Sequence, residues 1–301
     1  MNASLKPLNQ QVIVLTGASS GIGLCTAKLA AERGAKLVLV ARSEETLQNL
    51  VEQIVSNGGE AIHVVADVGD RDRMLFIGRE AIAHFGRIDT WINNAGVAIY
   101  GRLDEVSDAD NRRLFDTNFW GVVNGSLAAL PHLKANGGAL INLGSEVSDA
   151  VAPLQGMYSA SKHAVKGFTD ALRVEVEDVD KAPVSITLIQ PTAVDTPYPQ
   201  HAKNYMDREP KLPSPLIEPE DVAEAILKAA VEGGRDLKVG AMSVVNTTMA
   251  NLMPGLADKM SAKKVASQQE NVFPSRPEGT LYEPGRTGSV HGRGHEAQSS
   301  G

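Results

Sequence analysis

The chain has very little cysteine: Cys25 is the only one among 301 residues. A single cysteine excludes an internal disulfide and a metal site built from cysteines, and we expect no bound metal. Cys25 lies in an apolar helical stretch and is expected to be a small core residue. Basic residues are also fewer than acidic ones, and the formal net charge of -7 argues against a nucleic-acid partner.

Long apolar runs are missing as well. No segment reaches the roughly 20 apolar residues of a membrane span, and the N-terminus lacks the basic region and apolar run of a secretion signal. We therefore expect a cytoplasmic protein with no membrane partner. Hydrophobic residues make up 43% and charged residues 22% of the chain, which is ordinary for a globular protein.

The first feature that is present is a strand, a glycine-rich turn and a helix. The apolar run 12–15 predicts a strand buried on both faces, and it leads into Thr16-Gly17-Ala18-Ser19-Ser20-Gly21-Ile22-Gly23. Glycines let the backbone approach a pyrophosphate, and the helix N-terminus presents free N–H groups to it. A tight turn without a ligand is the alternative, and three glycines with hydroxyl side chains in one turn make it the weaker one.

The second predicted strand, 36–40, ends at Arg42 with no acidic residue before Glu44. NAD enzymes place an acid there to hold the ribose 2′-hydroxyl, whereas an arginine accommodates the 2′-phosphate of NADP. We therefore predict that NADP(H) is preferred and that NAD(H) is possible. The alternative is that Ser43 caps the next helix and Arg42 is a solvated surface charge.

Strands and helices then alternate along the chain. Further strands are predicted at 61–66, 88–92, 139–143, 184–189 and 237–239, with helical segments between most of them. This pattern predicts an α/β fold of the Rossmann type, a doubly wound parallel sheet in a single domain. Ligands of such sheets bind at the carboxyl ends of the strands, where the sequence places Gly17, Arg42, Asp67, Asn94, Ser145 and Pro191.

Tyr158 and Lys162 stand four residues apart in a predicted helix, which puts both side chains on one face. A nearby ammonium lowers the phenol pKa from its usual value of about 10, so the pair can exchange a proton with an alcohol or alkoxide. A half-exposed helix face is the alternative. Asn118 lies among bulky apolar residues of another predicted helix and needs a buried partner or a function.

The last third of the chain is less regular. Residues 1–250 are predicted to form the cofactor-binding domain, in which the proline-rich stretch 192–219 is a lid loop carrying Tyr198, Tyr205 and Met206. Residues 251–301 form a C-terminal extension, expected to be largely flexible or used in oligomer contacts. Beyond about residue 261 it is rich in Gly, Pro and Ser and cannot fold alone, although Phe273, Leu281 and Tyr282 could anchor it on a neighbouring subunit.

These motifs, in their order and spacing, resemble the classical short-chain dehydrogenase/reductase family over about residues 10 to 240. The resemblance rests on Thr16-Gly17-x-x-x-Gly21-x-Gly23, Asn93-Asn94-Ala95-Gly96, Asn118, Ser145, Tyr158-x-x-x-Lys162 and Pro191. It implies an oxidoreductase that transfers a hydride between NADP(H) and a small carbonyl or alcohol substrate, with carbonyl reduction as the favoured direction. It also implies a homodimer or homotetramer.

The resemblance further implies roles for individual residues. Tyr158 is the general acid/base, Lys162 lowers its pKa and binds the nicotinamide ribose, Ser145 orients the substrate oxygen, and Asn118 holds a water in a proton relay. The implied cofactor-binding residues are Gly17, Ser19, Ser20, Gly21, Ile22, Gly23, Arg42, Asp67, Val68, Asn94, Ala95, Gly96, Tyr158, Lys162, Pro191 and Thr196.

The sequence departs from the family pattern at two positions. Thr192 stands where the family commonly has glycine, and could crowd the nicotinamide pocket or add a hydroxyl to it. Glu146 follows Ser145 in place of a small residue, and could reach the mouth of the site or point to solvent.

Two other functions stay open: an NAD-linked alcohol or steroid-like dehydrogenase, or a nucleotide-sensing scaffold protein without turnover. The complete set of four catalytic residues argues against the scaffold.

Overall fold

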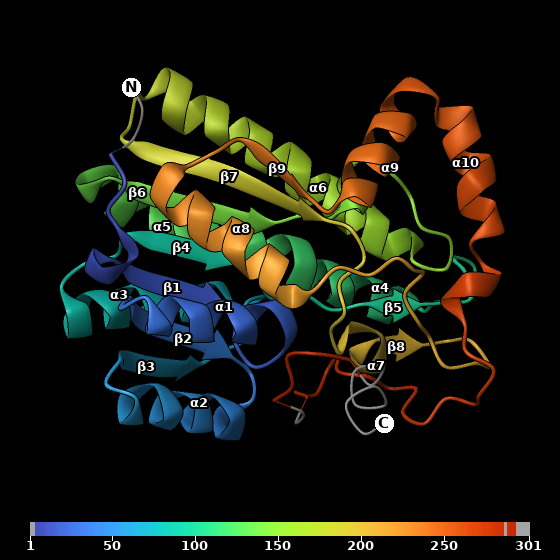
Figure 1. The fold of residues 1–301 in the computed structure, drawn as a ribbon, viewed down its shortest axis with the longest axis horizontal. Helices are drawn as coiled ribbons and strands as arrows, with labels where there is room; N and C mark the ends of the chain where they lie inside the picture. The colour runs from blue at the N-terminus through green and yellow to red at the C-terminus, as the bar shows by residue number, and fades with distance from the viewer. Residues whose placement is uncertain (1–3, 286–287, 293–301) are drawn as a thin grey trace.

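The computed structural model describes residues 4–285 and 288–292, and they are built around a parallel sheet (Figure 1). In those residues the strand order is β3-β2-β1-β4-β6-β7-β9. Their bounds are β1 (Val12–Thr16), β2 (Lys36–Ala41), β3 (Glu60–Val65), β4 (Thr90–Asn93), β6 (Gly138–Leu143), β7 (Val184–Pro191) and β9 (Asp236–Val239). The predicted doubly wound parallel sheet is therefore confirmed. A two-stranded sheet of β5 (Ile99–Tyr100) and β8 (Lys203–Asn204) was not predicted.

Helices cover both faces of the sheet. One face packs against α1 (Gly21–Glu32), α2 (Glu44–Ser56) and α8 (Pro219–Glu232), and Figure 1 shows α1 and α8 across it. The other face packs against α3 (Arg71–Phe85), α5 (Gly121–Asn136) and α6 (Gly156–Arg173). Neighbouring residues of a strand point to opposite faces, so Ile13 and Leu15 join one apolar cluster and Val14 the other. This is why the strands read as continuous apolar runs.

The register brings the carboxyl ends of the central strands to one edge. Leu15 of β1 pairs with Ile92 of β4, and Asn93 at the end of β4 pairs with Asn142 of β6. The chain proceeds outward in one direction through β2 and β3 and in the other through β6 and β7. A crevice forms where the direction reverses, and such crevices bind ligands in open α/β sheets.

One long helical segment runs from residue 108 to residue 136. Helix α4 (Asp108–Phe115) begins at the predicted cap Ser107, whose hydroxyl accepts from the Asp110 backbone N–H at 3.2 Å. It continues through a π-helical turn, η2 (Asp116–Trp120), into α5. The sequence pattern showed one long helix here and gave no sign of the π-helical turn, which marks many functional sites.

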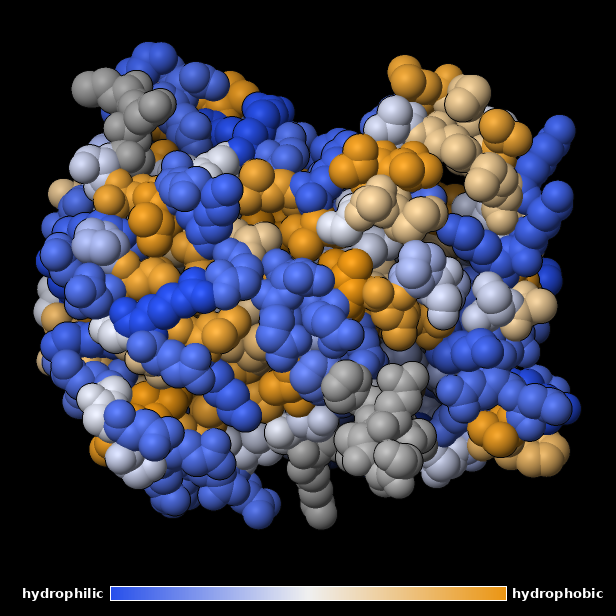
Figure 2. Space-filling model, in the orientation of Figure 1, coloured by the Kyte–Doolittle hydropathy of each residue, from blue (hydrophilic) through white to orange (hydrophobic). Residues whose placement is uncertain are grey.

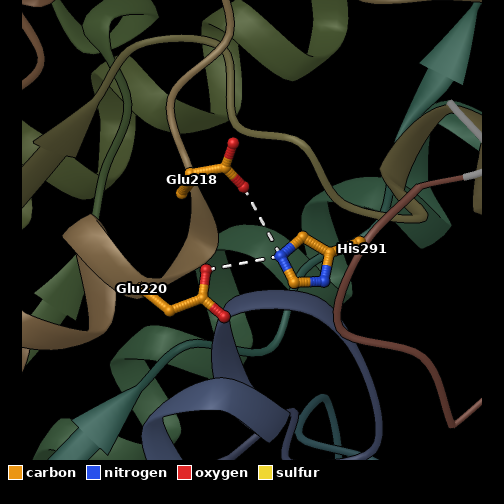
Figure 3. Close-up of side chains that lie close together, drawn as sticks. All are labelled: Glu218, Glu220 and His291. Carbon is orange, nitrogen blue, oxygen red and sulfur yellow. Dashed lines mark ion pairs between the residues drawn. The ribbon is translucent and has the colours of Figure 1, made fainter. Parts of the chain in front are cut away.

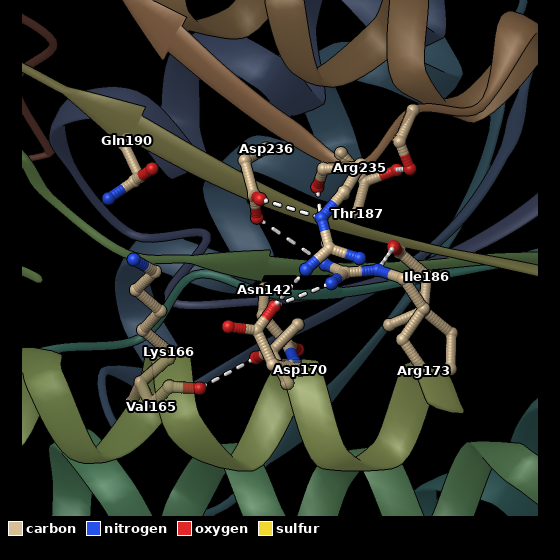
Figure 4. Close-up of polar contacts among 12 residues, drawn as sticks. Asn142, Val165, Lys166, Asp170, Arg173, Ile186, Thr187, Gln190, Arg235 and Asp236 are labelled. Carbon is tan, nitrogen blue, oxygen red and sulfur yellow. Dashed lines mark hydrogen bonds and ion pairs between the residues drawn. The ribbon is translucent and has the colours of Figure 1, made fainter. Parts of the chain in front are cut away.

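Polar contacts fasten α6 to the sheet (Figure 4). The buried Arg173 donates from Nε to the Ile186 carbonyl of β7 at 2.8 Å and from Nη1 to the Asp170 carboxylate at 2.6 Å. One helical turn before Arg173, the Thr169 hydroxyl accepts a hydrogen bond at 2.9 Å from the side-chain amide of Asn142 in β6. These bonds fix the C-terminal half of α6 and so hold in place the helix that carries Tyr158 and Lys162.

Replacing Arg173 by alanine should lower the free energy of unfolding by about 3–5 kcal/mol, as expected when one partner of a buried charged network is removed. Arg102→Ala is the control, because its side chain is 65% exposed and surface ion pairs contribute about 0–1 kcal/mol. Urea unfolding of the two variants measures the difference. Equal losses would show that the Arg173 network does not stabilise the fold.

The chain after the sheet continues in a pair of helices, α9 (Ala241–Leu252) and α10 (Pro254–Lys263). They stand beside the layered core, at the right of Figure 1, and Figure 2 shows apolar side chains gathered over them. Leu252 is 75% exposed there. Across the described part of the chain, no helix combines the length and the apolar character needed to cross a bilayer.

The segment after α10 turns back along the domain. Its composition predicts a flexible extension or an oligomer contact. Some of its described residues pack against their own chain, whereas Phe273 is 77% exposed. Leu281 is fully buried in a cluster with Val97, Ile99 and Leu114, and the Tyr282 hydroxyl donates to the Asp110 carboxylate at 2.7 Å. An existing apolar hollow thus supplies the burial that this segment cannot provide for itself.

Candidate active site

The glycine-rich turn after β1 is shaped by positions that only glycine fits. Gly17 and Gly21 have positive φ angles of 71° and 53°, which L side chains rarely adopt. At Gly23 an added Cβ would lie 2.1 Å from the Gly17 carbonyl oxygen. The Asn94 side chain ties this turn to β4 by donating to the carbonyls of Thr16 and Gly17 at 3.0 and 3.2 Å.

This turn forms one wall of a long groove. The groove gathers thirteen of the predicted cofactor residues, namely Gly17, Ser19, Ser20, Gly21, Ile22, Gly23, Arg42, Asp67, Val68, Asn94, Ala95, Gly96 and Thr196. An adjoining cavity holds the other three, Tyr158, Lys162 and Pro191, together with Ser145. Ile22, Asn94 and Thr196 line both spaces, so the groove and the cavity are continuous.

Asn118 lies in the π-helical turn η2 and is fully buried. Its side-chain oxygen accepts from the Val97 backbone N–H at 2.8 Å. Its amide donates to the Val97 carbonyl at 3.0 Å and to the Ser161 hydroxyl at 3.2 Å. The structure therefore supplies the buried partners that the sequence required, and Asn118 joins the segment after β4 to α6.

Tyr158 lies half-buried in the cavity, with its hydroxyl in hydrogen-bond contact with Tyr198 and Ser145. Burial raises the pKa of Tyr158 to about 12, against the lowering effect of these two hydrogen bonds, and the Glu146 carboxylate raises it further. The ring of Tyr198 meets that of Tyr158 edge to face, with centroids 5.5 Å apart.

Lys162 is buried beside this tyrosine, but its ammonium points elsewhere. Nζ donates to the Leu143 carbonyl at 2.7 Å and lies 5.7 Å from the centroid of the Tyr158 ring. Burial lowers the pKa of Lys162 to about 8. Burial is the largest influence on the pKa of Tyr158, and the effect of Lys162 on that pKa stays a prediction.

The two departures from the family pattern both line the cavity. Glu146 does not simply point to solvent, since its carboxylate accepts from the Asn246 side chain of α9 at 2.9 Å. Thr192 is buried, and its backbone N–H donates to the Val239 carbonyl at the end of β9 at 3.0 Å.

The predicted lid, 192–219, is more ordered than its prolines indicate. It contains the short helix α7 (Tyr198–His201) and the strand β8. Tyr198, Leu212 and Pro213 line the cavity, but Tyr205 and Met206 do not. The Tyr205 hydroxyl instead donates to the Asp110 carboxylate at 2.6 Å, so that ring serves to fix the segment.

Several lining residues escaped the sequence reasoning. Helices α9 and α10 and the turn after them give the cavity an outer wall that includes Asn246, Met249, Met260, Lys264 and Gln268. The only signal for it was a helical pattern around 249–260.

Arg113 of α4 forms an ion pair with Asp67, which lines the groove, and donates from Nε to the Leu281 carbonyl at 3.2 Å. These three residues are far apart in sequence, and nothing in the sequence connects them.

Comparison with known proteins decides which family this is. The model for short chain dehydrogenases matches residues 11–206. The chain belongs to the short-chain dehydrogenase family. It is 45% identical over 295 residues to the oxidoreductase YxnA of Bacillus subtilis, a match covering 96% of this chain and 82% of that protein. It is also 34% identical over 236 residues to 11-beta-hydroxysteroid dehydrogenase A of Sesamum indicum, covering 75% and 67% of the two chains.

Solved structures of this family show the same fold. An alcohol dehydrogenase of the archaeon Thermococcus sibiricus, complexed with 5-hydroxy-NADP, is similar with a TM-score of 0.67 and 26% identity, covering 76% of this chain and 95% of its own. A short chain dehydrogenase/reductase of Burkholderia phymatum in complex with NAD has a TM-score of 0.74 and 24% identity, covering 90% and 99%. As a short-chain dehydrogenase, this protein is an NAD(P)-dependent oxidoreductase acting on a small-molecule substrate.

The family model stops at residue 206, before α8, α9, α10 and the C-terminal segment. The match to YxnA covers 96% of the chain and therefore includes most of the residues after 261. The outer wall of the cavity thus lies beyond the family model but largely within the match to this relative.

Proposed function

We propose that this short-chain dehydrogenase is an NADP(H)-dependent carbonyl reductase. The observation that carries the proposal is Arg42, which follows β2 and lines the groove with no acidic residue at the end of that strand. Arg113 lies close enough to lower the pKa of Arg42, after burial as the larger cause. Two guanidinium groups beside each other favour a phosphate over a ribose hydroxyl.

The residues of the groove fit a dinucleotide. The N-terminus of α1 and its glycines would receive the pyrophosphate, Asp67 and Val68 would flank the adenine, and Asn94 would lie along the nicotinamide half. Lys162 would bind the nicotinamide ribose, and Thr196 the carboxamide. When bound, the cofactor supplies the hydride, while the protein supplies orientation and the proton.

The proton chemistry favours carbonyl reduction. With a pKa of about 12, Tyr158 is protonated at neutral pH and ready to give its proton to an oxygen that becomes negative as the carbonyl is reduced. Ser145, whose hydroxyl contacts that of Tyr158, would hold the same oxygen. Asn118 would hold the relay water through which Tyr158 is protonated again.

The cavity points to a mostly apolar substrate. Leu143, Val147, Val151 and Met249 line it alongside a few polar groups, the usual composition of a small-molecule site. We propose that the segment 192–219 and the pair α9–α10 together decide which carbonyl compounds fit.

A screen of aldehydes and ketones, followed by NADPH absorbance, tests the function. Reduction of a set of apolar carbonyl compounds supports it. No turnover with intact NADPH binding would favour the scaffold protein, and turnover restricted to NAD with alcohols would favour the steroid-like or alcohol dehydrogenase.

Arg42→Ala should reduce the preference for NADPH over NADH by about ten- to a hundredfold, because a charged hydrogen bond contributes about 1.5–3 kcal/mol. Arg33→Ala removes the same charge from a surface pair with Glu224 and should leave the preference unchanged. Dissociation constants for the two cofactors, measured by fluorescence titration, give the ratio. Equal affinity of the wild type for both cofactors would refute the proposed role.

We further propose that the protein works in the cytoplasm as a homodimer or homotetramer. Apolar side chains exposed on the helices behind the sheet support assembly, with Trp120 51% and Leu127 42% exposed. Such residues commonly mark an interface.

A further inference from the structure

The C-terminal strap, defined as residues 276–285 and 288–292, crosses the open side of the groove. Arg42 donates to three of its carbonyls: from Nη2 to Thr280 at 2.5 Å, and from Nη1 to Leu281 at 3.2 Å and Tyr282 at 3.0 Å. Arg113 donates to the Leu281 carbonyl as well. Farther along, the Ser289 carbonyl accepts from the backbone N–H of Gly21, the first residue of α1, at 2.9 Å.

The first part of the strap is hydrogen-bonded to the domain before the chain reaches the groove. The Pro277 carbonyl accepts from the Asn204 backbone N–H at 2.7 Å, and the Thr280 backbone N–H donates to the His201 carbonyl at 2.8 Å. Gly279 has a φ of 57°, and an added Cβ there would lie 2.4 Å from the carbonyl of Ala202. A side chain does not fit at this position, so glycine is required for the path that the strap takes here.

The far end of the strap is held by a clasp of one histidine and two glutamates (Figure 3). Nε2 of His291 lies 3.4 Å from a carboxylate oxygen of Glu218 and 3.4 Å from one of Glu220. Glu218 directly precedes α8 and Glu220 lies in its first turn. The clasp therefore connects the strap to the helix that packs beside α1.

Space remains between the strap and the sheet. Thr280, Pro284 and Gly285 line the groove from the strap side, opposite Ser19 and Asp67 of the domain. A ligand in this part of the groove would therefore be enclosed, and its exchange would require the strap to lift.

We propose that the strap and Arg113 are part of the cofactor site: the strap closes over the adenosine half of the dinucleotide and fixes the Arg42 and Arg113 guanidiniums for its 2′-phosphate. This rests on the proposed function. Two neighbouring guanidiniums repel each other, and the strap carbonyls offset that repulsion by accepting from both. The cofactor is then released only when the strap opens.

The first experiment measures the rate of NADPH dissociation by stopped-flow fluorescence in the full chain and in a chain ending at Glu283. That truncation removes Ser289 and His291 but keeps the buried Leu281. NADPH should dissociate at least about tenfold faster, the equivalent of about 1.4 kcal/mol. An unchanged rate, or tighter NADPH binding, would overturn the proposal, the latter because it would make the strap a competitor of the cofactor.

A point variant tests the clasp without shortening the chain. His291→Gln should also speed NADPH release, whereas His84→Gln, on the exposed end of α3, should not. The buffers contain EDTA, because the three donor atoms of the clasp lie within 4.8 Å of one another and could hold a metal ion. Equal release rates for both variants would show that the clasp does not hold the strap.

The role of Arg113 is tested by comparing its alanine variant with that of its neighbour Arg112. Arg113→Ala should lower the preference for NADPH over NADH by about tenfold, a loss equivalent to about 1.4 kcal/mol. Arg112→Ala changes the same charge on the exposed face of α4 and should change nothing. If Arg113→Ala leaves the preference intact, the role of Arg113 is refuted.

Failure of the proposed function and failure of the strap proposal give different results. If the wild type does not discriminate between the cofactors, the proposed NADP(H) preference fails, while the effect of the strap on release is still read with NADH. If the wild type prefers NADPH but the truncation leaves its release unchanged, the strap proposal fails and the proposed function stands. Thermal melting of each variant shows that it is folded.

Discussion

Tyr158→Phe is expected to lower turnover by at least about a hundredfold, since a positioned proton donor typically contributes 10²–10⁴-fold. The substitution removes only the hydroxyl. The ring still packs against Tyr198, and the groove loses no cofactor contact other than that hydroxyl. NADPH affinity should therefore stay close to that of the wild type while the carbonyl is no longer protonated.

Tyr205→Phe is the matched control for this variant. Its hydroxyl bonds to Asp110 away from the cavity, so turnover should change little. The measurements are the turnover rate on a good substrate and the NADPH dissociation constant of both variants. Near wild-type turnover of Tyr158→Phe would contradict the mechanism derived from the family.

The pH dependence follows from the direction of the Tyr158 shift. Because its pKa is raised to about 12, the proton donor stays protonated throughout the neutral range. Deprotonation of Tyr158 should therefore not slow carbonyl reduction near neutral pH. The reverse reaction, which needs the phenolate, should become faster as the pH rises.

Lys162→Met is expected to abolish most of the turnover and weaken NADPH binding, yet to make the fold more stable at neutral pH. The folded pKa of Lys162 is about 8, against 10.5 for the free side chain. Below pH 8 the ammonium is charged in both states, so the cost of burying it is fully present; it diminishes as the pH rises through 8 toward 10.5.

Each pKa unit corresponds to about 1.4 kcal/mol, and the bond to the Leu143 carbonyl that methionine loses offsets about 1–2 kcal/mol of this gain. We expect a net stabilisation of about 1–2 kcal/mol at neutral pH, which shrinks or reverses in alkaline buffer. Urea unfolding at both pH values measures it. Lys166→Met, one turn along α6, is the control for cofactor affinity. A Lys162→Met variant that is less stable at neutral pH, or binds NADPH like the wild type, would contradict this account.

The sheet and the position of the site could be predicted because local rules determine them. A strand buried on both faces must be apolar at consecutive positions, as in 12–15, and a turn with positive φ angles requires glycine at 17 and 21. Parallel strands bring their carboxyl ends to one edge. Residues that follow separate strands, such as Arg42, Asn94 and Ser145, therefore lie along that edge. Their placement there can be predicted from the sequence alone.

Features that depend on distant contacts could not be predicted. The pKa of Tyr158 is set by burial around its ring, and therefore by residues such as Tyr198 that only the fold brings near. The strap has the composition of a disordered tail, but Leu281 enters a hollow formed by Val97, Ile99 and Leu114. The pairing of Arg113 with Asp67 joins two segments whose connection only the structure reveals.

The outer wall of the cavity has a stereochemical consequence. Under the proposed function, reduction of an unsymmetrical ketone creates a chiral alcohol, and Tyr158, as the proposed proton donor, fixes where the carbonyl oxygen lies. The handedness of the product then depends on which of the two ketone substituents is accommodated beside Met249 and Met260. These methionines belong to α9 and α10, outside the part of the chain that holds Ser145, Tyr158 and Lys162. Resizing these two side chains is accordingly expected to change the enantioselectivity of the proposed reaction, with Ser145, Tyr158 and Lys162 left as they are.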